Sequence, residues 1–372
     1  MSSLHGLAPV RKDVIIIGGS LSGLLHGIIL HRLGCSVRIL EKSPRSTPVS
    51  HMAGVALGPD VLQFLSRFDC VQDVASLGIP SELLQSLDSN GQPHPFLYAT
   101  RIMSSWGALY FRLRANYDGL SSEYKNAVAR RYAGYVAWRG VVRESEVSDE
   151  TQHIFRKNIT YSVLKSHGAH VIVYYIPGEA GSVEPGQRLL NFCWYSNENT
   201  SHLDSILTDT SGHKHRITVP PHRLRPEIWA RQQKLAETIL APPYLEIVRK
   251  ISAPFVHLIT DHCSPQASFL NGKVLLVGDA SALLRPHIAF STNQAAYQAG
   301  LTERLVKGDI RLDEWEYQVT VATHLHWRRS VWFGNFFQRS WPSALWSAVL
   351  YWALVVVNAI RTWMGWLPKQ AV

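Results

Sequence analysis

Six residues near the start of the chain have the composition of a turn that binds phosphate groups. They read Gly18-Gly19-Ser20-Leu21-Ser22-Gly23 and stand between a β-branched run and an apolar stretch. Gly18 allows a tight turn out of a strand, and Gly23 allows the following helix to pack closely on the sheet. The unpaired N–H groups at the start of such a helix attract a pyrophosphate. Ser20 replaces the middle glycine of the G-x-G-x-x-G fingerprint, so the match is imperfect.

An acidic residue in the right place supports this interpretation of the turn. The apolar run Ser36–Leu40 is typical of a second strand, and Glu41 follows it directly. An acid at the end of that strand can accept hydrogen bonds from both ribose hydroxyls of an adenosine. A glycine-rich turn that binds nothing is the alternative, and the position of Glu41 argues against it.

A second segment, late in the chain, indicates which dinucleotide would bind. The apolar run Lys273–Val277 is followed by Gly278-Asp279, and a helix is expected from Thr292-Asn293 onward. An aspartate at a strand end can hold a ribityl hydroxyl, and the start of the helix can face the ring of a flavin or its pyrophosphate. A simple NAD dehydrogenase has no use for this late element. Together the two segments favour FAD.

The elements that must position these residues follow from hydrophobic patterning. Asp13–Ile17 is predicted to be a strand buried on both faces of a parallel sheet, followed by the helix Leu24–Leu33 and the strand Ser36–Leu40. Residues 60–120 are predicted to be mostly helical. Strands follow in residues 132–195, and helices are predicted over Pro226–Leu240 and Thr292–Lys307.

Composition excludes several classes of protein. The 372 residues carry a net charge of +9, and 46% are apolar against 17% charged, which is typical of a globular chain with a sizeable core. Its four cysteines lie far apart, which excludes a disulfide scaffold. The basic residues are scattered without stacking aromatics between them, so nucleic acid is not an expected partner. No histidine pair has a carboxylate at ligand spacing, and no metal site is predicted.

Three further motifs resemble a known family. They are Tyr132–Gly140 (YAGYVAWRG), Met103–Trp106 (MSSW) and Arg285-Pro286-His287. Together with the two nucleotide segments they resemble the FAD-dependent aromatic hydroxylases, which are single-component flavoprotein monooxygenases. Within that family they are similar to the branch that contains 2,6-dihydroxypyridine 3-monooxygenase. The resemblance covers roughly residues 12–330.

The resemblance implies a fold and a set of cofactor contacts. The fold is α/β, with a Rossmann-like FAD-binding domain and a mixed-sheet substrate domain. The implied boundaries are 12–131 and 266–330 for the two parts of the FAD domain and 132–265 for the substrate domain, with an apolar helical tail over 331–372. The resemblance implies pyrophosphate contacts at Gly18, Ser20, Leu21 and Gly23, and ribose contacts at Glu41 and Lys42. It implies contacts beside the flavin at Gly54, Thr292 and Asn293, and it implies that Asp279 binds the ribityl chain.

The chain departs from the family pattern in two respects. Relatives have a strand pair and an Asp-Gly motif before the segment that corresponds to Tyr132, and the residues between Tyr124 and Tyr132 are too few for them. The FAD domain is therefore expected to be trimmed, either as a natural variant or because the sequence is an incomplete gene product. Ala289 and Ser291 also stand where many relatives have glycines.

The family implies an activity, which leaves the substrate open. NAD(P)H reduces the flavin, which then activates O2 to insert one oxygen atom into an electron-rich ring, here an aromatic or polyketide-like molecule and possibly one of secondary metabolism. His287 is the candidate general base, although a histidine that caps a turn is the alternative. A non-catalytic, trimmed relative is a second hypothesis, and flavin-dependent dehydrogenation or epoxidation is a third. The aromatic residues Trp138, Tyr174, Phe192 and Trp194 are expected to line a substrate pocket or to fill a sheet core.

The C-terminal region has a different composition. No charged residue occurs from Ser340 to Ile360, a length that would span a bilayer, and tryptophans flank the segment. Residues 340–360 are expected to cross a membrane, to lie on its surface, or to form a buried terminal helix. The globular part is expected to face the cytoplasm.

Overall fold

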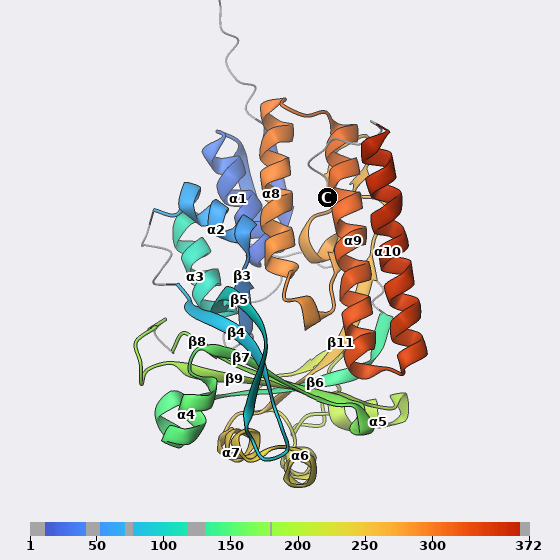
Figure 1. Ribbon diagram of the computed structural model, residues 1–372. Helices are drawn as coiled ribbons and strands as arrows, with labels where there is room; N and C mark the ends of the chain where they lie inside the picture. Colours follow the sequence, from blue (N-terminus) through green and yellow to red (C-terminus); the bar gives the residue numbers. More distant parts are fainter. Residues whose placement is uncertain (1–11, 42–52, 71–76, 118–130, 179–180, 365–372) are drawn as a thin grey trace, which may run out of the picture.

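The computed structural model describes residues 12–41, 53–70, 77–117, 131–178 and 181–364. Figure 1 shows a layer of helices above a large curled sheet, with shorter helices on the far side of the sheet. The fold is α/β with a mixed sheet, as predicted, and its elements fall into a nucleotide side and a substrate side.

The nucleotide side begins with the predicted βαβ unit. Strand β1 (Asp13–Ile17) leads into helix α1 (Leu21–Arg32), and β2 (Ser36–Leu40) pairs with β1 in parallel. Apolar residues of α1 pack against three further helices, which are α2 (Pro59–Phe68), α3 (Trp106–Tyr117) and α8 (Ser291–Lys307). The core of this side therefore lies among helices that cover one face of two strands.

The prediction that β1 is buried on both faces is wrong. Its residues alternate between exposed and half-buried, and the side chains of Ile15 and Ile17 are 62% and 74% exposed. Among the described residues, β1 pairs only with β2. The physical reason is that α1 covers one face of the pair and no described layer covers the other.

The predicted late strand Lys273–Val277 is also much shorter than expected. Only β13 (Val274–Leu275) is a strand, and it forms a small antiparallel pair with β12 (Ser268–Phe269) instead of joining β1. Gly278–Ala280 then forms a single turn of 3-10 helix, η4. Since Val274 is 42% exposed, this segment is not a buried strand. The described part of the sheet on the nucleotide side thus consists of two separate strand pairs, and the trimmed domain stays a prediction.

The substrate side is built on one ten-stranded mixed sheet with the order β10-β11-β6-β9-β8-β7-β4-β5-β3, in which β14 pairs with β11. The strands, in this order, are β10 (Thr218–Val219), β11 (Phe255–Cys263), β6 (Arg131–Arg143), β9 (Leu189–Asn197), β8 (Ala169–Ile176), β7 (Asn158–Leu164), β4 (Ile79–Leu87), β5 (Pro93–Ser105), β3 (Gly54–Leu57) and β14 (Ala282–Leu283). Strands β4 and β7 are parallel, and the other neighbours are antiparallel.

Residues 60–120 are not mostly helical, contrary to the prediction. Between α2 and α3 lies the hairpin of β4 and β5, which joins the large sheet beside β7. The Asp88 carboxylate accepts hydrogen bonds from the N–H groups of Asn90 and Gln92, which fixes the turn of the hairpin. Aromatic and aliphatic residues recur at helix-like spacing in this region, so the sequence predicted a helix in place of the two strands.

The far face of the sheet holds the largest apolar core. Trp138, Phe192 and Trp194 are fully buried there against helices of the opposite layer. These helices are α4 (Asp149–Phe155), α5 (Thr200–Leu207), α6 (Pro226–Ile239) and α7 (Pro242–Lys250). The three aromatics therefore fill a sheet core and do not line a pocket, whereas Tyr174 lies in a different cluster on β8.

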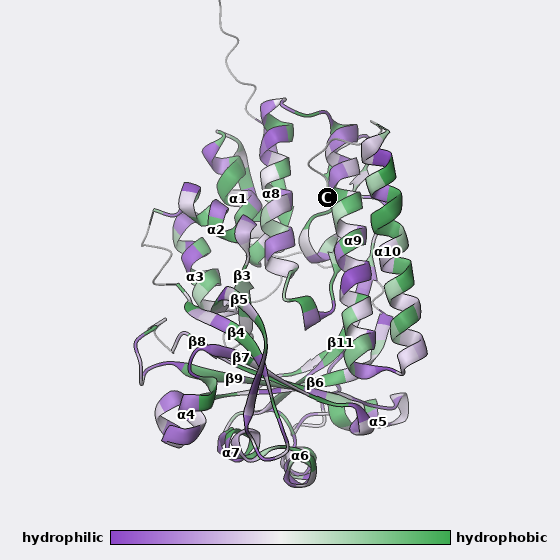
Figure 2. Cartoon of the chain, viewed as in Figure 1, coloured by the Kyte–Doolittle hydropathy of each residue, from purple (hydrophilic) through white to green (hydrophobic). Residues whose placement is uncertain are grey.

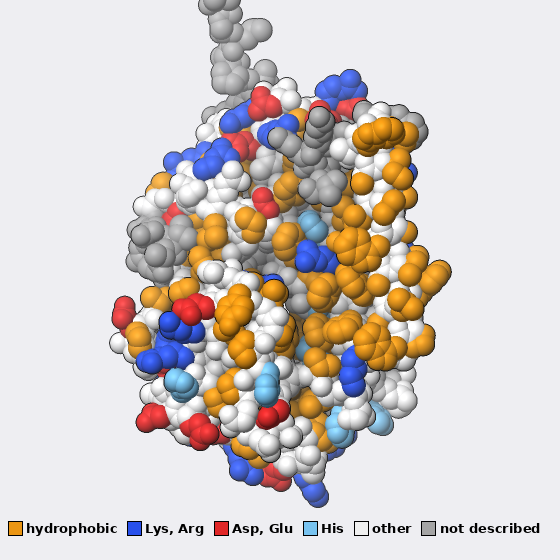
Figure 3. Space-filling model, in the orientation of Figure 1, with side chains coloured by type: hydrophobic (Ala, Val, Ile, Leu, Met, Phe, Trp, Pro, Cys, Tyr) orange, Lys and Arg blue, Asp and Glu red, His pale blue; other side chains and the backbone are white. Residues whose placement is uncertain are grey.

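Two long antiparallel helices close the chain. Helix α9 (Leu312–Gln338) packs against the sheet and α8, and α10 (Trp341–Trp363) packs on α9 (Figure 1). The only buried residues of α10 are Ala344, Ser347 and Asn358, while its opposite face is apolar and exposed (Figures 2 and 3). It is long and apolar enough to cross a membrane, and only 17% of its most apolar window is buried. The alternative of a buried terminal helix is therefore wrong.

Candidate functional site

The turn after β1 has the geometry that a bound pyrophosphate requires. Gly18 has a φ of +104°, which only glycine adopts without strain. A Cβ atom on Gly23 would lie 1.9 Å from the carbonyl oxygen of Gly18, so a glycine is needed there for close packing. Helix α1 begins at Leu21 after Ser20, without a side-chain cap or an acid in its first turn. Its N-terminal N–H groups therefore fit an anionic ligand.

Glu41 lies at this turn, where a ribose contact is predicted. Its Oε2 accepts a hydrogen bond of 2.7 Å from the N–H of Gly19. Strand pairing brings the two residues together, because Ile17 at the end of β1 lies opposite Leu40 at the end of β2. Lys42, the second predicted ribose contact, lies outside the described residues.

The late segment meets the first turn in space. A Cβ atom on Gly278 would lie 2.5 Å from the hydroxyl oxygen of Ser22, so η4 sits directly against the start of α1. The N–H of Gly278 donates to Oε1 of Gln298 on α8 at 2.6 Å, which anchors η4. Asp279 is next in this turn and is exposed. The two segments predicted to hold the two ends of FAD are therefore adjacent.

Thr292 and Asn293 lie in the first turn of α8, as predicted, and both are buried. The Asn293 side chain bonds α2: its Oδ1 accepts from the N–H of Asp60 at 2.9 Å, and its Nδ2 donates to the Asp60 carboxylate at 2.6 Å. Burial raises the pKa of Asp60, and the bond from Asn293 partly opposes this rise. The Asn293 side chain thus ties α8 to α2, and α8 itself begins without a side-chain cap.

Gly54, at the start of β3, lies against the substrate side. A Cβ atom there would be 2.2 Å from the hydroxyl oxygen of Tyr174 on β8. The glycine therefore allows β3 to approach Tyr174 closely at the boundary between the two sides of the molecule.

His287 lies in a cluster of rings between the sheet and α9. It belongs to the 3-10 turn η5 (Pro286–Ile288), and its Nε2 shares a hydrogen bond of 2.6 Å with the hydroxyl of Tyr135 on β6. The rings of Tyr195, His170 and Phe337 lie 4.9, 5.0 and 5.8 Å from the His287 ring. His287 thus contacts side chains from three strands and a helix.

Both histidines of this cluster are neutral near pH 7. Burial lowers the pKa of His287 well below its usual value, and the positive charge of Arg285 lowers it further. Burial also lowers the pKa of His170 to about 3. Nδ1 of His287 is buried and has no hydrogen-bond partner among the described residues. When Nε2 carries the proton and donates it to Tyr135, Nδ1 is left as a buried acceptor without a hydrogen-bond partner among the described residues.

Sequence reasoning missed Tyr135, Tyr195 and His170. Residues alternate along a strand, so Tyr135 and Tyr195 face away from the core that contains Trp138 and Trp194. This period-two pattern was the available signal, but a sequence does not reveal which face of a sheet meets a cofactor domain. In the described part of the chain, no group of three or more histidine, cysteine or acidic residues is placed to hold a metal ion.

Comparisons with known proteins agree with this geometry. A family model described as "FAD binding domain" matches residues 11–153, and one described as "FAD binding domain-like" matches residues 132–261. The chain is 28% identical to 2,6-dihydroxypyridine 3-monooxygenase of Paenarthrobacter nicotinovorans, over 86% of this chain and 90% of that protein.

Solved structures share the fold. The 2,6-dihydroxypyridine-3-hydroxylase of Arthrobacter nicotinovorans matches with a TM-score of 0.79 at 23% identity, over 89% of this chain and 94% of that one. HpxO of Klebsiella pneumoniae, in complex with FAD and uric acid, matches with a TM-score of 0.68 at 15% identity, over 93% of each chain. With its two FAD-binding matches and a relative that matches over most of both chains, the chain is similar to the FAD-dependent aromatic hydroxylases, and it is an oxidoreductase of the monooxygenase type.

Proposed function

We propose that this enzyme uses NAD(P)H and O2 to hydroxylate an aromatic or polyketide-like small molecule, in a reaction of secondary metabolism. The observation that supports the proposal is the close approach of Gly278 to Ser22, which brings together the two segments that we assign to one FAD site. The residues present fit that cofactor, because two uncapped helix starts and Glu41 lie along it.

The chain's own residues would orient the substrate and manage its proton. Bound FAD supplies the redox chemistry that activates oxygen. His287 would accept the proton of a ring hydroxyl at Nδ1, while the Tyr135 hydroxyl holds Nε2 in the tautomer that leaves Nδ1 free. Loss of that proton makes the ring richer in electrons and easier to hydroxylate. The surrounding rings of Tyr195, His170 and Phe337 would exclude water.

The substrate class follows from this chemistry and from relatives. HpxO is in complex with uric acid, and another solved relative, PqsL of Pseudomonas aeruginosa, is in complex with 2-aminobenzoylacetate. Both ligands contain a planar ring and carry several oxygen atoms. In this chain, Arg139 projects from the same face of β6 as Tyr135, and its Nε is buried without a partner among the described residues. A planar hydroxylated or carboxylated ring is therefore the substrate that we propose.

The test separates oxygen insertion from flavin reduction. We expect His287→Gln to lower product formation about 100-fold or more, while substrate-stimulated NAD(P)H oxidation continues. Tyr135→Phe should cause a smaller loss, because it removes the hydrogen bond and keeps the ring. The control is His213→Gln, at a histidine outside this cluster. Wild-type rates of product formation in His287→Gln would refute the role of His287.

A non-catalytic role is the second candidate, and the reduced sheet favours it. Because Ile15 and Ile17 are exposed on β1, the sheet on the nucleotide side is less well packed than the sheet on the substrate side. Substrate-dependent consumption of NAD(P)H with one oxygen atom inserted into the product would exclude this role. Mass analysis of the product would also separate hydroxylation from dehydrogenation or epoxidation.

We also propose that the protein attaches to a membrane, with its globular part facing the cytoplasm. Helix α10 is polar toward the protein, where Asn335 Nδ2 donates to Ser347 Oγ at 2.5 Å, and apolar toward the outside. A helix on a water-exposed surface has the reverse arrangement. These polar contacts hold α10 along α9. We therefore propose that α10 lies in the membrane interface and does not span the membrane. Vesicle sedimentation of the full chain and of a chain ending at Arg339 tests this proposal.

A further inference from the structure

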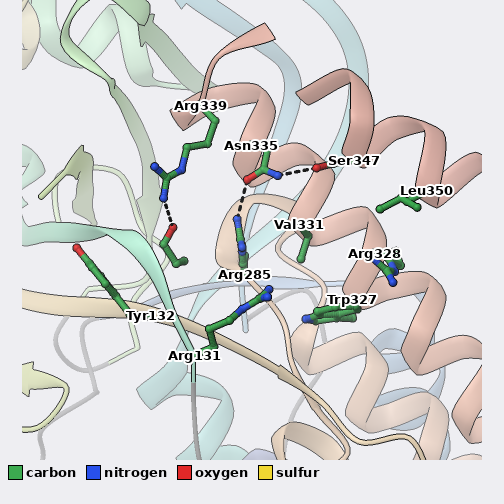
Figure 4. Close-up of a pocket in the computed structure, with 11 residues that line it drawn as sticks. Arg131, Tyr132, Arg285, Trp327, Arg328, Val331, Asn335, Arg339, Ser347 and Leu350 are labelled. Carbon is green, nitrogen blue, oxygen red and sulfur yellow. Dashed lines mark hydrogen bonds between the residues drawn. The ribbon is translucent and has the colours of Figure 1, made fainter. Parts of the chain in front are cut away.

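A basic pocket lies at the junction of β6, α9 and α10. Its volume is about 410 Å³, and Figure 4 shows the side chains that surround it. Four arginines contribute to its wall. Arg131 belongs to β6, Arg285 precedes η5, Arg328 belongs to α9, and Arg339 follows the end of α9. Leu350 and Ser347 of α10 close one side. This pocket adjoins the ring cluster through Arg285, and its lining does not include His287 or Tyr135.

The positive charge of the pocket is only partly compensated. The Asp261 carboxylate accepts from Arg131 at 3.0 Å and from Arg285 at 2.7 Å, so one acid serves two arginines. Arg339 donates to the carbonyl oxygen of Ala133 at 3.0 Å, which is a neutral partner. Arg328 lies over the ring of Trp327 and forms no ion pair with a described residue. The end of the pocket at Arg328 therefore attracts an anion.

The apolar face of α10 continues into this pocket. Leu350 lines the pocket and is half-buried, whereas the neighbouring Trp346 and Val349 are 63% and 49% exposed. An anion site and an apolar surface thus share one border. A phospholipid has the same combination, since its phosphate group lies next to its acyl chains. Arginine is also suited to phosphate, because its planar guanidinium donates two parallel hydrogen bonds.

We infer that this pocket binds the phosphate group of an anionic phospholipid from the membrane on which α10 lies. Arg328 would hold the phosphate, and the neighbouring Leu350 would border the acyl region. The inference rests on the membrane attachment proposed above, and it adds a specific lipid site to it. Such a site would fix the rotation of α10 at the membrane surface and so orient the globular part.

The test uses the full chain with vesicles of two compositions. We expect more of the protein to sediment with vesicles that contain phosphatidylglycerol than with vesicles of pure phosphatidylcholine. Arg328→Gln should weaken binding to the anionic vesicles about fivefold and leave binding to neutral vesicles unchanged. The matched control is Arg329→Gln, which makes the same charge change at the neighbouring exposed residue outside the pocket. Val331→Trp fills the pocket without a change in charge and should also abolish the preference for anionic vesicles.

Each other outcome contradicts the inference in a different way. Equal losses in Arg328→Gln and Arg329→Gln would indicate a diffuse basic surface, and equal binding of the wild type to both vesicles would exclude a headgroup site. Binding of inorganic phosphate that depends on Arg328, without a preference for anionic vesicles, would make a soluble phosphate the ligand. Failure to bind either vesicle would overturn the membrane attachment itself, and none of these results depends on monooxygenase activity.

Discussion

The nucleotide side and the substrate side are stabilised in different ways. On the substrate side, strands β8 and β9 lie in the middle of ten strands, and nearly all their residues are buried. On the nucleotide side, β1 and β2 form a pair, and the isoleucines of one face remain exposed. The substrate side therefore has the larger core, whereas the nucleotide side depends on helix packing around α1.

Removing a core aromatic tests this contrast with the largest expected effect. Phe192→Ala should lower the free energy of unfolding by about 3–5 kcal/mol, because it leaves a cavity in the sheet core. Ile17→Thr, on the exposed face of β1, should change it by about 0.5 kcal/mol or less. Denaturant unfolding of both variants measures the difference. Similar losses at the two positions would mean that the two sides are equally well packed.

A single glycine tests the close packing of the phosphate-binding turn. Gly23→Ala should cost about 1–3 kcal/mol and weaken FAD binding, because its Cβ would overlap the carbonyl oxygen of Gly18. The matched control is Gly300→Ala in α8, where a Cβ meets nothing within 4 Å. It should be neutral or should stabilise the helix by up to about 1 kcal/mol. Thermal unfolding with and without FAD measures both, and an unaffected Gly23→Ala protein would contradict the geometry of the turn.

The buried histidines predict a loss of stability in acid. The unfolded chain binds a proton at His170 near pH 6.5, while the folded protein binds it only near pH 3, so the unfolded state holds more protons between these values. The contribution of His170 to the free energy of unfolding therefore has its full value above pH 6.5, and it falls as the pH is lowered. Between pH 6.5 and 5 we expect His170 to account for about 1.5 kcal/mol of that fall.

The variant His170→Gln isolates this contribution from that of other buried histidines. Its free energy of unfolding should fall less steeply than that of the wild type over the same interval, as measured by urea titration at several pH values. Parallel curves for the two proteins would show that His170 titrates normally in the folded state.

The smallest predicted effect concerns Ala289, which precedes the flavin-side helix α8. It has a φ of +49°, a left-handed conformation that disfavours residues with a Cβ. Ala289→Gly should raise the free energy of unfolding by about 0.5–1 kcal/mol. The control Ala280→Gly, at an exposed residue without a positive φ, should give no gain. A loss of stability in Ala289→Gly would show that its backbone is not strained.

The contrast between the two sides also explains what the sequence could predict. The βαβ unit, the strands from Ala169 to Asn197 and helix α8 follow local periodicity, and the structure confirms them. The hairpin of β4 and β5 did not follow from its sequence, because its pairing with β7 joins residues far apart in the chain. The burial of β1 was wrong for a related reason, since burial depends on neighbouring strands that local patterns do not reveal.

The sequence named the nucleotide part of the candidate site and His287, and the roles of these residues stay predictions. Gly18, Glu41 and Asp279 belong to compact motifs, so their chemistry could be inferred from spacing. The Tyr135 to His287 hydrogen bond and the Arg328 pocket each join distant segments, and only the folded structure brings them together.

Titration of the purified protein with FAD tests the central claim most directly. We predict that the protein is yellow as isolated or takes up added FAD in an equimolar complex, with quenching of flavin fluorescence. Glu41→Ala should weaken this binding by about tenfold or more, because it removes a charged hydrogen-bond acceptor, and Glu41→Gln should weaken it less. A folded, colourless protein that leaves the fluorescence of added FAD unchanged would contradict the account.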